Sequence, residues 1–448
     1  MSESGSNPQP PGRAYANYVL GALTVMYLFN YLDRWVLSIL VEDIKEEFGA
    51  SDNLMGFLLG PAFAVFYTTL GLPVARLADR RSRRVIISIA FAVWSLMTAV
   101  CGLARSSAEL ALARIGVGVG EAGGTAPAHS MLADYFPPER RAFAFGVFQQ
   151  GVYGGQLVGL TAGAALAIHF DWRQTFWIFG LAGVAAAGLL FVTVREPARG
   201  TFDGPSQGGG KAPADAEALP TIGEVFRFLW QRRSFRGLAI GAGIAAFGGT
   251  GFGVWMPALL ERSLGMDKAA IGFQFGTAMA VSSCLGALLA GRVTDILYRR
   301  DLRWLLWVPA LSVLCSLPLL LVQAFAPTPM VAILAAIPTG LIGAGWAPPI
   351  YAATQRLAPA RMRAIAASII VLFITLLGQG GGPWAVGILS DFFEPEFGSD
   401  AIRVAMAAAL STYLIAVVVL WRGARTFVED VAAVDASVAQ GGPSNGRG

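Results

Sequence analysis

Long runs of apolar residues recur throughout this chain of 448 residues and limit its possible folds more than any other feature. A helix needs about 20 mostly apolar residues to cross the hydrocarbon core of a bilayer. Six such runs precede a polar gap at 195–236, and six follow it. We therefore predict membrane-spanning helices over 16–40, 53–75, 85–104, 108–133, 142–168, 173–194, 237–260, 270–291, 303–323, 328–353, 364–389 and 401–421.

The composition agrees with an all-α membrane protein of twelve transmembrane helices in two six-helix bundles. Hydrophobic residues make up 55% of the chain and charged residues only 14%, whereas soluble domains carry about 25% charged residues. An ordinary cytosolic enzyme, a disordered scaffold and a nucleic-acid binder are therefore excluded. The three cysteines lie in apolar runs without metal-ligand spacing, and no nucleophile signature is present. We expect no enzymatic activity, no cofactor and no metal.

The chain divides into segments of different polarity. We predict a cytoplasmic tail at 1–14, an N-terminal bundle at 15–194, a cytoplasmic linker at 195–236, a C-terminal bundle at 237–421 and a cytoplasmic tail at 422–448. Apolar residues at helical spacing, flanked by arginines, predict a helix in the membrane interface at the end of the linker, from residue 222 onward. The small, polar residues after Arg425 predict disorder.

Lysine and arginine residues predict the orientation, because they are enriched on the cytoplasmic side. With both termini cytoplasmic, most of the 33 Lys and Arg residues fall in the termini and in cytoplasmic loops. The residues that fall on the outside are Lys45, Arg105, Arg173, Arg262, Lys268 and Arg403, and Arg34 and Arg114 lie within helices.

The two halves of the chain resemble each other. Asp79 in the first half corresponds to Asp295 in the second, and Gly118 and Pro127 correspond to Gly340 and Pro349. Duplicated six-helix halves are typical of secondary transporters, in which the substrate site lies between the halves. A nucleotide-driven pump is disfavoured, because Ala212 follows Gly210-Lys211 where a phosphate-binding loop requires Ser or Thr. A receptor would need no such duplication.

Two motifs carry a resemblance to a known family. Leu77-Ala78-Asp79-Arg80-Arg81-Ser82-Arg83-Arg84 resembles the loop 2–3 signature of the major facilitator superfamily, and Arg114-x-x-x-Gly118 resembles its second signature. Asn30-Tyr31-Leu32-Asp33-Arg34 and Gly118-x-Gly120-Glu121-Ala122 are similar to bacterial Spinster-type transporters. The resemblance implies a monomeric carrier of the bacterial inner (plasma) membrane that works by alternating access. Animal members of that family move sphingosine phosphate and lysophospholipids.

Four charged residues fall inside the predicted membrane core: Asp33, Arg34, Arg114 and Glu121. Each costs several kcal/mol alone at mid-bilayer, roughly 2.5–3.5 on insertion scales, and should face water or a partner. Helical spacing predicts that Asp33, Arg114 and Glu121 form a ladder between helices 1 and 4. Arg34 lies about 100° around its helix from Asp33 and is expected to point elsewhere. The alternative is a structural ion pair that holds helices 1 and 4 together.

The functional hypothesis combines proton coupling with anion binding. Asp33 and Glu121 would exchange protons, and Arg114 would bind an anionic headgroup, since guanidinium geometry suits phosphate. The second half lacks these charges and is rich in aromatic residues, which favours an amphiphile. The predicted substrate-binding residues are Arg114, Glu121, Asp33, Asn30, Tyr31, Trp255, Trp346 and Phe373. We expect lipid-like small molecules and protons as partners. The alternative is a proton-coupled carrier of a small organic anion or drug.

Other motifs predict how the carrier changes conformation. In the superfamily the counterpart of Asp79 meets the N-terminus of helix 11, so this resemblance implies conformational gating by Asp79, Arg80, Arg83, Arg84 and Asp295. The segment from Gly387 to Asp391 is a weaker echo of the signature. In helix 5, Gly151, Gly155, Gly159 and Gly163 form a stripe that allows close helix packing. We expect this stripe to pack against a helix of the other half.

Overall fold

The computed structural model describes residues 12–199, 201–202, 221–359 and 362–439, and every regular element in these ranges is a helix. The chain forms two compact units, which are described separately below. Unit 1 comprises Met1–Leu37 and Val65–Ala218, and unit 2 comprises Ser38–Ala64 and Leu219–Gly448. Residues 38–64, which the sequence assigns to the N-terminal bundle, therefore group with the second half of the chain.

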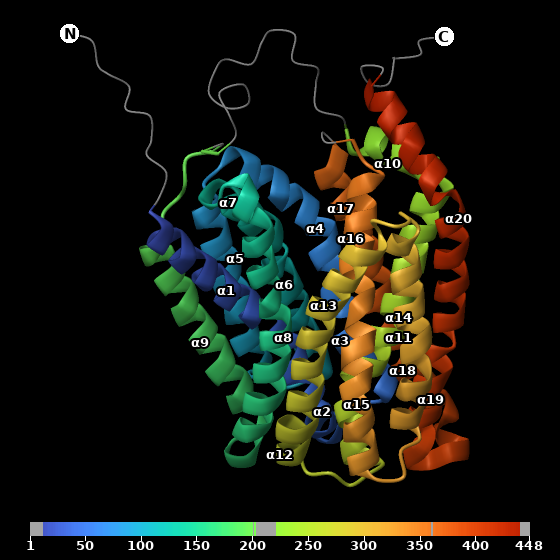
Figure 1. Ribbon diagram of the computed structural model, residues 1–448. Coiled ribbons are helices and arrows are strands. Elements are labelled where there is room, and N and C mark those ends of the chain that lie inside the picture. The colour runs from blue at the N-terminus through green and yellow to red at the C-terminus, as the bar shows by residue number, and fades with distance from the viewer. Residues whose placement is uncertain (1–11, 200, 203–220, 360–361, 440–448) are drawn as a thin grey trace, which may run out of the picture. The chain divides into compact units, whose positions relative to one another are not determined.

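Unit 1 is a bundle built mainly around α5, which packs against both α6 and α9 (Figure 1). Side-chain oxygens cap the N-termini of several of its helices. Ser82 accepts a hydrogen bond from the backbone N–H of Val85, and Asp171 accepts one from the backbone N–H of Gln174. The helices are α1 (Arg13–Ile39), α4 (Pro61–Arg80), α5 (Arg83–Cys101), α6 (Ser107–Glu121), α7 (Thr125–Tyr135), α8 (Pro138–His169) and α9 (Trp172–Thr193).

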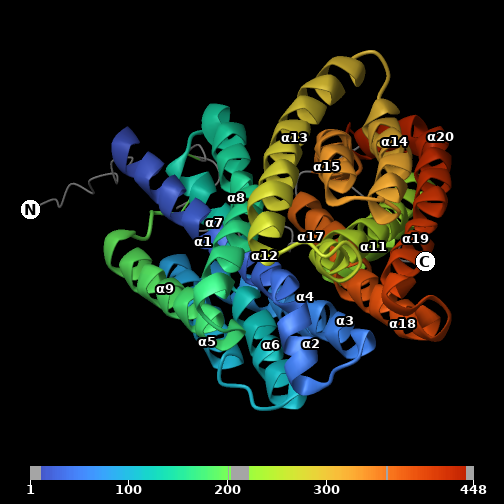
Figure 2. The same cartoon turned by 90° about the horizontal axis from the view of Figure 1, so that it is seen from below.

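Unit 2 is organised around the long α11, which contacts α18, α19 and α20 (Figure 2). Its helices are α2 (Val41–Phe48), α3 (Asp52–Leu59), α10 (Ile222–Trp230), α11 (Arg233–Arg262), α12 (Lys268–Ala270), α13 (Thr277–Leu297), α14 (Trp304–Ala324), α15 (Pro329–Gly343), α16 (Ala347–Arg356), α17 (Arg363–Phe373), α18 (Gly382–Phe397), α19 (Ala401–Leu410) and α20 (Thr412–Ala439). Two π-helical segments, Ile271–Gly276 and Ile374–Gly381, precede α13 and α18, and short 3₁₀ turns at Ala344–Trp346 and Gly398–Asp400 precede α16 and α19.

The helices coincide with the predicted membrane spans, although several spans are built from two helices. Residues 53–75 form α3 and α4, which meet at Gly60, and residues 108–133 form α6 and α7. Within the described residues, nine helical stretches are long and apolar enough to cross a membrane, and the last, Ile365–Ser437, covers two predicted spans. The helical architecture expected from the apolar runs is thus present.

The expected disorder after Arg425 is wrong for the residues up to Ala439. The helix α20 continues through them because Phe427, Val431 and Val434 recur at helical spacing and are buried. Asp430 on the same helix accepts hydrogen bonds from the Ser234 backbone N–H (3.0 Å) and hydroxyl (2.6 Å) at the start of α11. Residues 440–448 lie outside the described part of the chain.

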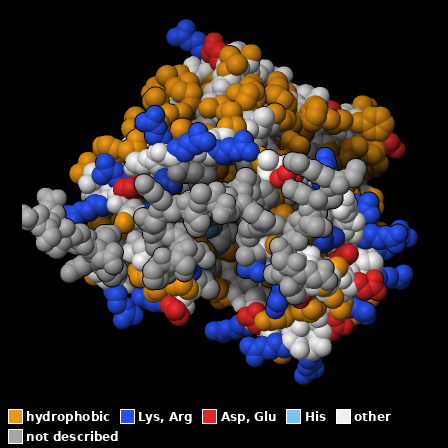
Figure 3. Space-filling view, turned by 90° about the horizontal axis from the view of Figure 1, so that it is seen from above, with side chains coloured by type: hydrophobic (Ala, Val, Ile, Leu, Met, Phe, Trp, Pro, Cys, Tyr) orange, Lys and Arg blue, Asp and Glu red, His pale blue; other side chains and the backbone are white. Residues whose placement is uncertain are grey.

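The predicted linker helix is formed by α10. Thr221 and Glu224 make a capping box at its start. Val225 and Leu229 are buried in the core of unit 2, and Trp230 stacks on Phe373 of α17, with ring centroids 5.7 Å apart. In Figure 1, α10 and the last turns of α20 lie at the upper end of unit 2, and the view onto this face shows many Lys and Arg side chains (Figure 3). That this face is cytoplasmic stays a prediction.

The glycine stripe of α8 packs within its own unit, which corrects the expectation of a contact with the other half. A Cβ atom on Gly151 would lie 2.9 Å from the Thr24 carbonyl oxygen, and one on Gly155 would lie 2.5 Å from that of Leu28. Gly159 meets the backbone of Leu32 in the same way, and Gly163 is buried one turn further on. The partner helix is α1, which also carries the predicted proton-coupling aspartate.

Candidate functional site

Asp33 lies in the interior of unit 1, where three helices meet. It is 2% exposed, and its Oδ2 accepts a hydrogen bond from the Thr98 hydroxyl of α5. Its Oδ1 has no hydrogen-bond partner. Arg114 of α6 and Arg34 of its own helix interact with it electrostatically. Asp33 and Arg114, predicted to approach each other, are therefore neighbours.

Glu121 is fully buried and forms an ion pair with Arg34, whose Nη2 lies 2.7 Å from Oε2. The angular position of Arg34 predicted that its side chain would point away from the ladder, and this prediction is wrong. The Arg34 side chain is long enough to reach α6, and its guanidinium lies over the Tyr31 ring at 4.7 Å and near the Tyr67 ring at 5.8 Å. Asn30 accepts a hydrogen bond from Arg34 at 3.3 Å. The predicted residues Asn30 and Tyr31 thus surround Arg34 rather than Asp33.

Arg114 is the most unusual member of the group. Its residue is 1% exposed, and neither Nε nor Nη1 has a hydrogen-bond partner. Electrostatic interactions connect it to Asp33 and to Glu121. Buried cationic donors without hydrogen-bond partners are costly, and a guanidinium presents donors in a fork that matches carboxylate or phosphate. In this conformation Arg114 therefore has unused donors beside two carboxylates.

Sequence reasoning missed two members of the site, Thr98 and Tyr67. Both lie within predicted membrane spans and carry no formal charge, so a search restricted to charged residues passes over them. A search for every hydroxyl inside a predicted span would have included both residues.

In unit 2, the predicted aromatic substrate contacts are parts of packed regions. Trp255 is fully buried, and its Nε1 donates a hydrogen bond to the Pro383 carbonyl at 2.8 Å. Trp346 and Phe373 are partly buried and pack against the core that includes Ile350 and Ile370. Their contact with a substrate stays a prediction.

The predicted gating residues differ in their surroundings. Arg83 is buried in unit 1, where Nε lies 2.9 Å from Glu196 and Nη1 lies 2.5 Å from Asp134. Arg84 stacks over Phe191 at 4.8 Å, whereas Arg80 is exposed. In unit 2, Asp295 is exposed. The Asp79 side chain lies outside the described part of the structure.

Glu196 follows α9 and completes the Arg83 cluster. Burial would raise the pKa of its carboxyl, but hydrogen bonds from the Arg84 backbone, the Arg83 guanidinium and the Ser82 hydroxyl outweigh burial and lower the pKa below its usual value. A lowered pKa means that the ionised carboxylate stabilises the folded chain.

We expect Glu196→Gln to lower the stability of the protein by about 1–3 kcal/mol at neutral pH, because charge-assisted hydrogen bonds are lost. The carboxylate contributes fully above its usual pKa near 4.5, and this contribution is lost as the pH falls through the lower folded pKa. The unfolding temperatures of the two proteins in detergent should therefore converge in acid. The exposed Glu139→Gln serves as a control and should unfold like the wild type at every pH. If the unfolding temperatures of Glu196→Gln and wild type differed by the same amount at every pH, the stabilising role of the ionised Glu196 carboxylate would be contradicted.

A second polar cluster lies in unit 2 and is centred on Asp52 at the start of α3. Its carboxylate contacts Arg262 (2.6 Å), Lys45 (2.7 Å) and Ser390 (2.6 Å). Asp391, the aspartate of the weaker signature echo, accepts hydrogen bonds from the first backbone N–H groups of α3, at 2.9 Å each. The echo therefore has a structural role, since an acidic group at a helix N-terminus is stabilising.

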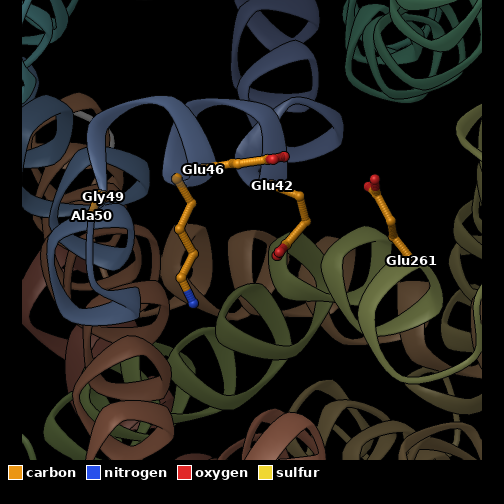
Figure 4. Close-up of a pocket in the computed structure, with 6 residues that line it drawn as sticks. Glu42, Glu46, Gly49, Ala50 and Glu261 are labelled. Carbon is orange, nitrogen blue, oxygen red and sulfur yellow. The ribbon is translucent and has the colours of Figure 1, made fainter.

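A pocket of about 460 Å³ lies beside this cluster (Figure 4). Its lining residues are Glu42, Lys45, Glu46, Gly49, Ala50 and Glu261. Glu42 is paired with Arg262 at 2.7 Å, and Glu261 lies 3.2 Å from Lys268. Within the described residues, no group of His, Cys, Asp and Glu side chains has the arrangement of a metal site.

Comparison with known proteins identifies the family. The model of the Major Facilitator Superfamily matches residues 23–383 and 238–436. An MFS-type efflux pump of Mycolicibacterium smegmatis is 31% identical over 94% of this chain and 95% of the relative. The sphingosine-1-phosphate transporter SPNS2 of Danio rerio is 25% identical over 85% of this chain and 77% of the relative.

A solved structure is similar over nearly the whole chain. The crystal structure of a bacterial homologue of the human lysosomal transporter Spinster, in an inward-facing and unoccupied conformation, superposes with a TM-score of 0.84 at 29% identity. It covers 94% of this chain and 99% of that chain. These relatives are transporters rather than enzymes. The chain therefore belongs to the Major Facilitator Superfamily, as a Spinster-like membrane transporter with two pseudo-symmetric bundles of six transmembrane helices.

Proposed function

We propose that this transporter moves an amphiphilic anionic lipid, such as a lysophospholipid or a sphingosine-phosphate-like molecule, by alternating access, and that protons drive or gate the movement. The observation that carries the proposal is the buried Arg114 guanidinium, which has unused hydrogen-bond donors beside Asp33 and Glu121.

The arrangement supports competition for one cation. A phosphate that enters the site would take up the free donors of Arg114, and charge-assisted hydrogen bonds of this kind are among the strongest in proteins. The substrate would then compete for the charge of Arg114 mainly with Asp33, and less with Glu121, which keeps its ion pair with Arg34. A carboxylate that loses its cationic partner binds a proton more readily. Substrate binding and protonation would thereby be coupled.

The lipid-like substrate is supported by the relatives and by the apolar second half. One relative is named as a sphingosine-1-phosphate transporter, and others are named as Spinster homologues. The relative from Mycolicibacterium smegmatis is named as an efflux pump, which favours the second candidate, a proton-coupled carrier of a small organic anion or drug.

We further propose that the transporter is a monomer in a bacterial inner membrane, with both termini cytoplasmic. We propose that its conformational change is gated through Asp79, Arg80, Arg83, Arg84 and Asp295.

The deciding experiment measures flux of a lysolipid panel in proteoliposomes, with and without a pH gradient. Saturable lysolipid flux that responds to the gradient is the expected result. Saturable uptake of a small hydrophilic anion that lysolipids do not inhibit would favour the second candidate instead.

Glu121→Gln should weaken the dependence of this flux on the pH gradient, because glutamine cannot bind or release a proton and only Asp33 remains to do so. The matched control is Glu109→Gln on the same helix, since Glu109 is exposed and caps the backbone at Arg105. Retention of the normal pH-gradient dependence in Glu121→Gln would remove Glu121 from the mechanism.

A further inference from the structure

The Thr98 hydroxyl has two acceptors but only one proton. Thr98 Oγ1 lies within hydrogen-bond distance of Asp33 Oδ2 and also lies 2.9 Å from the Trp94 carbonyl oxygen, one turn earlier in α5. A hydroxyl donates one hydrogen bond and can accept others. At any moment it can therefore donate either to the carboxylate or to the carbonyl.

We infer that Thr98 is a positioning residue that hydrogen-bonds Asp33 in both of its protonation states. When Asp33 is ionised, the Thr98 hydroxyl donates to Oδ2. When Asp33 is protonated on Oδ2, its O–H donates to Thr98 Oγ1, and the Thr98 proton turns to the Trp94 carbonyl. Both states then keep Oδ2 and the Thr98 hydroxyl fully hydrogen-bonded. This inference deepens the proposed function, in which Asp33 gains and loses a proton.

The Thr98 hydroxyl is important because of the groups that surround the Asp33 carboxyl. The groups that interact with the carboxyl are Arg34 on α1, Arg114 and Glu121 on α6, and Thr98 and the Cys101 thiol on α5. Among the hydrogen bonds of the described residues, the bond from Thr98 is the one made to the Asp33 side chain, and Oδ1 has none. A carboxyl buried without any partner in one protonation state would strongly resist entering that state. Thr98 supplies a hydrogen-bond partner in both protonation states without adding a charge.

The test measures protonation of Asp33 directly. Infrared spectra of the purified full-length protein are recorded over a pH series, and the carboxyl C=O band that disappears in Asp33→Asn is assigned to Asp33. In Thr98→Val, which keeps the shape and removes the hydroxyl, the pH at half-formation of the band should shift upward by about one unit. The shift follows because the ionised form loses the stronger hydrogen bond. Thr98→Ser, which keeps the hydroxyl, should titrate like the wild type.

Thr175→Val is the matched control. Thr175 is also buried in unit 1 and donates to a carbonyl four residues earlier, that of Asp171 at 3.0 Å. This variant should leave the band unchanged. A band that titrates alike in Thr98→Val and wild type, or that does not titrate while the protein is folded, would overturn the inference. Because the readout needs no transport, a failure of proton-coupled flux with a normal shift of the band would reject the proposed coupling alone.

Discussion

Replacing Arg114 with glutamine should reduce uptake of an anionic lysolipid into proteoliposomes by about a hundredfold. Truncating one partner of a buried, hydrogen-bonded charge pair costs roughly 2–5 kcal/mol of binding, and a hundredfold loss corresponds to about 3 kcal/mol. Arg114 is buried and has free donors in the described structure, so a bound phosphate would depend on it. Arg114→Lys keeps the charge but not the fork of donors, and it should recover only part of the uptake.

Two measurements separate loss of binding from loss of folding. The unfolding temperature of each variant in detergent shows whether the protein remains intact. Arg105→Gln, at an exposed position just before α6, is the matched control and should transport normally. A folded Arg114→Gln that takes up lysolipid like the wild type would remove Arg114 from the substrate site.

The charges of the site could be predicted because burial of a charge in a membrane is costly. Four ionisable residues stand out in long apolar runs, and the structure brings all four into one electrostatic network. The pairing within the network could not be predicted from angular position alone. A guanidinium lies several bonds from its Cα atom, so Arg34 reaches Glu121 although it lies about 100° around its helix from Asp33.

The helix that packs against the glycine stripe could not be predicted from the sequence either. A glycine stripe indicates that some backbone approaches closely, but the sequence does not identify which helix provides it. The structure assigns α1 to the stripe of α8. The grouping of residues 38–64 with unit 2 has a similar cause. It depends on specific contacts such as those of Asp52 with Arg262 and Ser390, which join positions distant in sequence.

Gly155→Ala should both destabilise the protein and impair transport, because the new methyl group would strike the backbone of α1. The Cβ atom would lie 2.5 Å from the Leu28 carbonyl oxygen and 2.7 Å from the Tyr31 Cβ atom. Backbone atoms cannot move aside singly, so α1 would have to shift away from α8. Overpacking of this kind costs typically 1–3 kcal/mol and occasionally more. The unfolding temperature in detergent measures this effect.

Gly154→Ala provides a control at the neighbouring position. Its Cβ atom would lie 3.2 Å from the Leu28 Cδ1 atom, which is the end of a flexible side chain. We expect little loss of stability or lysolipid uptake in this variant. Since α1 carries Asp33 and Arg34, a shift of α1 in Gly155→Ala would also alter their distances to Arg114 and Glu121. Uptake should therefore fall even at temperatures where Gly155→Ala is fully folded, and normal uptake there would show that the site tolerates movement of α1.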